Sequence, residues 1–81
     1  MNPEQAKART RALLNVIETV YELKIINLEA IIEVITEKTL DSNEILAICT
    51  GLNTWMALNA ALGGYVEIPL EVVHGLAEKI R

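Results

Sequence analysis

Polar side chains recur at steps of three, four or seven residues along the first half of the chain, and this spacing constrains the fold more than any other feature. They are Glu4, Lys7, Arg11, Asn15, Glu18, Glu22, Glu29, Glu33 and Glu37. Only Ile26 interrupts the pattern, and no glycine or proline lies within it. Because an α-helix repeats every 3.6 residues, these positions form one stripe on its surface. The stripe predicts one long helix over about residues 3–38, with its weakest point at Ile25-Ile26-Asn27, where β-branched residues and a candidate cap favour a break.

Two further helices are indicated by their ends. Asp41 is a good N-cap with Glu44 three residues later, and Gly63-Gly64 stops the helix that follows. A short extended link then leads to Pro69, which opens the last helix. We find no internal repeat in the sequence. The prediction is a single helical domain over residues 1–81, with helices at about 3–38, 42–62 and 69–80.

Apolar residues form two adjoining seams on the long helix, and hydrophobic residues make up 52% of the chain of 81. One seam is Leu14, Ile17, Tyr21, Leu28, Ile31 and Ile35; the other is Leu13, Val16, Val20, Leu23, Ala30 and Val34. Two seams indicate contact with more than one neighbour. We expect an all-α fold in which the long and second helices form an antiparallel hairpin with a short C-terminal helix. The excess apolar surface predicts that hairpins pack as an oligomeric helical bundle, a homo-oligomer that is a dimer or larger.

Charge is unevenly distributed along the chain, which has a net charge of −4. No Lys or Arg lies between Lys38 and Lys79, so a phosphate backbone would meet cations only near the start of the chain. The single cysteine, Cys49, excludes an intrachain disulfide and favours a reducing compartment. With no apolar segment at the polar N-terminus, we expect a cytoplasmic protein rather than a secreted one.

The run Leu46-Ala47-Ile48-Cys49-Thr50-Gly51-Leu52-Asn53 resembles the helix-turn-helix fingerprint of DNA-binding proteins. The resemblance implies a turn at Thr50–Asn53 and a recognition helix over Thr54–Ala61. That segment departs from the family because it holds no Arg, Lys or Gln to contact bases. The alternative is one continuous helix in which Gly51 permits a close approach by a neighbour.

The segment Ile45–Val66 carries no charge at all. It is long enough to cross a bilayer, but Asn53 and Asn59 would be costly at membrane depth. The alternative is the central, fully buried helix of a bundle, which is also uncharged all round. We expect the buried helix and no membrane association.

The sequence offers few residues suited to catalysis or metal binding. Glu71 and His74 have the i, i+3 spacing of carboxylate-bridged di-metal bundles, but the glutamates of the long helix face away from the predicted core. Ser42 lies beside a helix cap, and Cys49 is expected to be a buried small hydrophobe without a positioned base. We therefore expect no catalytic residues, no metal and no cofactor, and a protein that is not an enzyme.

The function favoured by these observations is protein–protein interaction, as an adaptor, inhibitor or regulatory subunit of the type found in phages or mobile elements. One alternative is a binding or sequestering protein that holds a small anionic ligand in a pocket at the subunit interface. A second is a helix-turn-helix-like DNA-binding regulator. The candidate residues for contact with ligand or partner are Tyr21, Lys24, Asn53, Trp55, Asn59, Arg9 and Arg11.

Overall fold

The computed structural model describes residues 2–60 and 63–80, and these are mostly helical with one small sheet. Its elements are α1 (Pro3–Tyr21), β1 (Leu23–Ile25), α2 (Leu28–Thr36), α3 (Ser42–Asn59), β2 (Gly64–Val66) and α4 (Leu70–Lys79). The second and third predicted helices are present, as α3 and α4. The second helix, predicted to reach residue 62, ends earlier, because α3 stops at Asn59 and its C-cap Ala60 is extended (φ −85°, ψ 142°). Residues 61 and 62 lie outside the described residues. The extended link before Pro69 is also confirmed, since it contains β2.

The single long helix predicted over residues 3–38 is wrong, because α1 ends at Tyr21. Glu22 adopts the left-handed conformation (φ 52°), and its N–H caps the helix by donating to the carbonyls of Glu18 and Thr19. The Glu18 carboxylate then accepts a hydrogen bond from the Ile25 N–H (2.7 Å), which fixes the start of the next segment. The polar stripe does not reveal this break because α2 resumes with the same spacing of glutamates.

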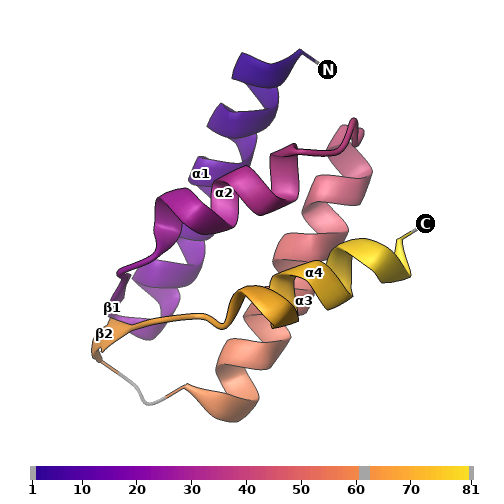
Figure 1. The fold of residues 1–81 in the computed structure, drawn as a ribbon. Helices are drawn as coiled ribbons and strands as arrows, with labels where there is room; N and C mark the ends of the chain where they lie inside the picture. Colours follow the sequence, from indigo (N-terminus) through magenta and orange to yellow (C-terminus); the bar gives the residue numbers. More distant parts are fainter. Residues whose placement is uncertain (1, 61–62, 81) are drawn as a thin grey trace.

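The element order repeats: helix, strand, helix in α1–β1–α2, and again in α3–β2–α4 (Figure 1). The two strands pair in parallel, with Leu23 opposite Gly64 and Ile25 opposite Val66. In each half a left-handed residue precedes the strand, Glu22 in the first and Gly63 in the second. The sequence analysis found no internal repeat, whereas the structure shows a repeated order of elements.

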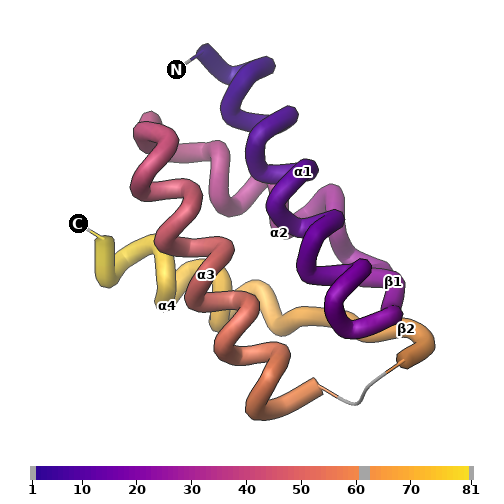
Figure 2. Tube along the Cα trace, turned by 180° about the vertical axis from the view of Figure 1, so that it is seen from behind, coloured from indigo at the N-terminus to yellow at the C-terminus, as the bar shows by residue number. Residues whose placement is uncertain are grey.

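The predicted antiparallel hairpin is replaced by a different arrangement. Both views show α1 and α3 beginning at the same end of the molecule and running in the same direction toward the other (Figures 1 and 2). The first helices of the two halves pack together, as do the second helices, α2 and α4. The equivalent elements of the repeat therefore lie side by side.

Asn27 joins the two halves beside the sheet. Its side-chain N–H donates to the Ile68 carbonyl (2.7 Å), and its side-chain oxygen accepts from the Ile68 N–H (3.1 Å). Asn27 was predicted as a cap at a helix break, but it makes no side-chain cap hydrogen bond to α2. It satisfies the backbone of the opposite half instead.

A single chain covers most of its own apolar seams. Leu14 and Ile17 of α1 are buried with Ile31 and Ile35 of α2 in one core cluster. The exposed surface is 4817 Å², close to the roughly 4,900 Å² that size scaling gives for a folded monomer of 9.0 kDa. The expectation that one copy cannot cover these seams is therefore wrong for most of their length, because the chain turns after Tyr21 and α2 packs back onto α1. Among the residues of both seams only Val16 and Val20 remain exposed.

Candidate functional site

Helix α3 lies at the surface with one side in the core and the other in solvent. Ile45, Leu52 and Met56 are buried, whereas the exposed positions from residue 45 onward are Leu46, Ala47, Thr50, Asn53, Thr54, Ala57, Leu58 and Asn59. The prediction of a fully buried central helix is wrong. The uncharged sequence of α3 suggested full burial, but alanine, threonine and leucine occupy the exposed side of this helix. Among the described residues, no helix combines the length and apolar character needed to span a membrane.

An apolar groove runs between α1 and α3. It has a volume of about 160 Å³. Its lining residues are Leu13, Val16, Ile17, Leu46, Cys49, Thr50 and Asn53, and we call this set the α1–α3 groove. None of them carries a formal charge. Val16 and Leu46 on its sides are 58% and 41% exposed, and Val20, one turn beyond Val16, is 62% exposed. The groove and the exposed side of α3 together form an uncharged surface.

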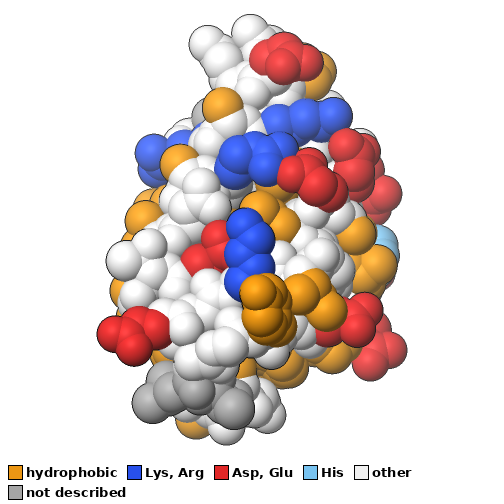
Figure 3. All heavy atoms as spheres, turned by 90° about the vertical axis from the view of Figure 1, so that its left-hand side faces the viewer, with side chains coloured by type: hydrophobic (Ala, Val, Ile, Leu, Met, Phe, Trp, Pro, Cys, Tyr) orange, Lys and Arg blue, Asp and Glu red, His pale blue; other side chains and the backbone are white. Residues whose placement is uncertain are grey.

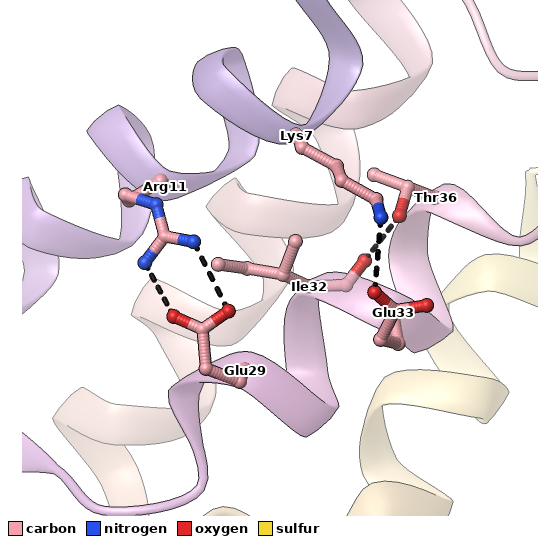
Figure 4. Close-up of polar contacts among 6 residues, drawn as sticks. All are labelled: Lys7, Arg11, Glu29, Ile32, Glu33 and Thr36. Carbon is pink, nitrogen blue, oxygen red and sulfur yellow. Dashed lines mark hydrogen bonds and ion pairs between the residues drawn. The ribbon is translucent and has the colours of Figure 1, made fainter. Parts of the chain in front are cut away.

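The two ion-paired cations of α1 lie on the side of the helix away from this groove, whereas Arg9 is near enough to it to act on Cys49. Lys7 pairs with Glu33 (3.1 Å) and Arg11 makes a bidentate pair with Glu29 (2.5 and 3.0 Å), so both cations point toward α2 (Figure 4). Figure 3 shows Lys and Arg side chains beside acidic ones on the upper part of this face. Leu13 and the two exposed valines lie on the other side of α1. The ion pairs therefore stay clear of the groove.

Arg11 and Glu29 stabilise each other's charged forms. The hydrogen bond between them raises the pKa of Arg11 and lowers the pKa of Glu29. Both groups are well exposed, so this pair contributes little to folding. Its consequence for the site is that Arg11, predicted to bind an anion or a partner, already has a carboxylate partner in its own chain.

Two of the predicted contact residues meet at one end of the groove. The Tyr21 hydroxyl donates to the Asn53 carbonyl (2.9 Å), which ties the end of α1 to the middle of α3. Asn53 lines the groove, and Tyr21 packs against the core. This part of the predicted site is assembled, as a structural contact beside an apolar groove.

The remaining predicted residues do not converge on one pocket. Trp55 is half-buried against the core, and the Asn59 side chain donates to the Trp55 carbonyl (3.0 Å). Arg9 is exposed on α1, and Lys24 is exposed on β1 opposite Tyr65. The side chains predicted to surround an anion are thus spread over several elements.

Lys24 lines a second, open hollow of about 580 Å³ beside the strands. Its lining residues are Asn15, Glu18, Thr19, Glu22, Leu23, Lys24, Gly64 and Tyr65. Two carboxylates face one ammonium there, and Glu18 is already bonded to the Ile25 N–H. The charge balance of this hollow is unfavourable for an anionic ligand.

Cys49 lies at the floor of the groove and is buried. Burial raises the pKa of its thiol to about 12, although the nearby positive charge of Arg9 acts in the opposite direction. A thiol with this pKa is protonated at neutral pH and is a poor nucleophile. Cys49 therefore contributes packing to the groove.

The motifs considered in the sequence are not assembled into sites. α3 continues through Gly51 without the turn that the helix-turn-helix resemblance implies. The alternative is confirmed, because a Cβ on Gly51 would lie 2.6 Å from Cδ2 of Leu76 in α4. The His74 ring lies 4.0 Å from Glu37 rather than in a cluster with Glu71, and the described residues contain no group of three metal-ligating side chains.

Sequence reasoning did not single out Val16, Val20 and Leu46, which the structure leaves exposed on or beside the groove. Val16 and Val20 belong to the second apolar seam, and we assigned that whole seam to a bundle core. One feature of the sequence could have indicated them. The chain contains both this second apolar seam and a helix without charge over Ile45–Asn59, and two such apolar surfaces can lie side by side. Comparison of the chain with protein-family models, with curated proteins and with solved structures finds no match.

Proposed function

We propose that the protein acts by binding another protein chain through the α1–α3 groove and the exposed side of α3, as an adaptor, inhibitor or regulatory subunit does. The observation that carries this proposal is the uncharged, solvent-exposed side of α3 beside an apolar groove. A helix with no charged face is ordinarily buried. In this chain half of it faces solvent, which is typical of a surface that another chain covers.

The energy available at this surface supports the proposal. Full burial of an aliphatic side chain contributes about 1.5–3 kcal/mol. Val16, Val20 and Leu46 are each exposed by two fifths or more and lie on or beside the groove. Because no ionised group lines the groove, a partner would cover it without stripping water from a charge.

Anion binding receives less support. The seven residues predicted for contact lie on several elements, and the hollow that contains Lys24 also contains Glu18 and Glu22. DNA binding is weakened by the continuity of α3, since the turn that would present a recognition helix is missing. Neither alternative has an observation of its own in its favour.

Site-specific photo-crosslinking in the cells that encode the protein tests the proposal. A photoreactive amino acid at Val16 is compared with one at Ile26, because these side chains are almost equally exposed (58% and 59%) and only Val16 lines the groove. We expect discrete crosslinked adducts from position 16 and none from position 26. Absence of adducts at position 16, or the same adducts at both positions, contradicts the proposal.

A further inference from the structure

We infer that the chain covering the α1–α3 groove is a second copy of this protein, related to the first by a two-fold axis. This inference rests on the proposed function and names the partner. A two-fold contact needs a surface that is complementary to itself, so that a projection and a recess occur on the same face. The α1–α3 face has both features: Val16 and Val20 project one turn apart, and the groove lies beside them.

The size of the groove favours side chains over a whole helix as its occupant. Its volume is about 160 Å³, whereas an α-helix with side chains is about 10–12 Å across. Aliphatic side chains spaced one turn apart fit such a recess as ridges fit grooves in helix packing. Val16 and Val20 of a second copy have that spacing.

Charge also favours contact between copies at this face. The chain has a net charge of −4, so two copies repel each other at long range. The opposite face carries exposed Glu33, Glu37, Glu71 and Glu78, and contact there would bring like charges together. The α1–α3 groove is lined by neutral residues, and Arg9 is the charge that acts on Cys49 at its floor. Two copies therefore meet there with fewer like charges than on the acidic face.

The outline of the face is about two thirds of the area that a standard dimer interface buries on each partner. A standard interface buries about 800 Å² on each partner, roughly one sixth of the 4817 Å² surface of this chain. Helices of 19 and 18 residues are about 28 Å long, and two side by side cover an outline about 20 Å wide. That outline is roughly 550 Å², and the corrugation of the side chains raises the accessible area toward the standard value.

Sedimentation equilibrium of the purified full chain between about 1 and 200 μM tests the inference. We expect a monomer–dimer equilibrium reaching twice 9.0 kDa. Val16→Glu places a charge in the contact and should raise the dissociation constant about tenfold or more. Ile26→Glu is the matched control and should leave it within about twofold. A wild-type monomer at every concentration, or equal effects of the two variants, overturns the inference.

Disulfide crosslinking between copies tests the same inference if the Val16→Glu variant fails to fold. Thr50→Cys in a Cys49→Ala background places a thiol on the exposed side of α3 beside the groove. We expect oxidation to give a covalent dimer within minutes, whereas Ile26→Cys in the same background stays monomeric on that timescale. No dimer from position 50, or equal dimer from both, overturns the inference. The protein could instead be monomeric in solution while position 16 gives crosslinked adducts of other masses in cells. That result would retain the proposed function and reject only the second copy as the partner.

Discussion

At the scale of single residues, two helix-interior glycines have opposite surroundings. A Cβ on Gly51 would meet the Leu76 side chain at 2.6 Å, whereas a Cβ on Gly75 would have no neighbour within 4 Å. We expect Gly75→Ala to raise the free energy of unfolding by about 0.5–1 kcal/mol through helix propensity. Gly51→Val should lower it by about 1–3 kcal/mol through overpacking against α4. Urea denaturation measures both, and stabilisation by Gly51→Val would contradict the close packing of α3 on α4.

Cys49 gives a prediction about alkaline pH. Burial raises the pKa of its thiol from the ordinary 9.0 to about 12, so the unfolded chain releases the thiol proton first as pH rises. The contribution of the buried thiol to stability is complete below about pH 9 and declines by up to about 1.4 kcal/mol per pH unit between 9 and 12. The free energy of unfolding of wild type minus that of Cys49→Ala should be constant below pH 9 and decrease above it. A constant difference up to pH 11 would show that the thiol is not desolvated.

At the scale of elements, the strand in each half is preceded by a left-handed residue of a different type. Glu22 has φ 52° and Gly63 has φ 80°. A residue with a Cβ is strained in this conformation, whereas glycine is not. We expect Glu22→Gly to raise the free energy of unfolding by about 0.5–1 kcal/mol and Gly63→Ala to lower it by about 1 kcal/mol. Thermal unfolding followed by circular dichroism provides the measurement, and Glu22→Gln controls for the lost carboxylate.

The starts of the helices could be predicted from the sequence, but the break after α1 could not. Asn2 with Gln5, and Asp41 with Glu44, form complete capping boxes at the starts of α1 and α3. These are local hydrogen bonds between residues three apart, which a sequence displays directly. The break depends on Glu22 in an unfavourable conformation and on the pairing of β1 with β2, some 40 residues away. Such a long-range contact leaves no periodic signal.

At the scale of the whole molecule, Asn27 couples the two halves. Asn27→Ala removes both hydrogen bonds to Ile68, whose residue is fully buried, and leaves its N–H and carbonyl without these partners. We expect a loss of about 2–4 kcal/mol, since each unsatisfied buried group costs about 1–3 kcal/mol. Asn27→Asp retains only the acceptor and brings a carboxylate toward the Ile68 carbonyl, so it should also destabilise the fold. Chemical denaturation measures these losses, and a loss below about 0.5 kcal/mol for Asn27→Ala would contradict the coupling.

The apolar character of the candidate surface was predictable from the sequence, but the residues that form it were not. Excess apolar character predicted that some apolar surface would stay exposed, and Val16, Val20 and Leu46 are among the large apolar residues that do. The sequence could not identify these residues because a seam looks the same whether its own chain or another chain covers it. The turn after Tyr21 decides which part of the seam is covered, since α2 packs onto one side of α1 and leaves the other side beside α3.

The repeated helix–strand–helix order has a consequence for a chain severed between α2 and α3. Each fragment would hold one strand of three residues whose hydrogen-bonding partner lies on the other fragment. Neither could complete its sheet or enclose its apolar side alone. Mixed together, the two fragments carry every contact of the intact core, and complementation between them would reconstitute the fold from two separately made peptides.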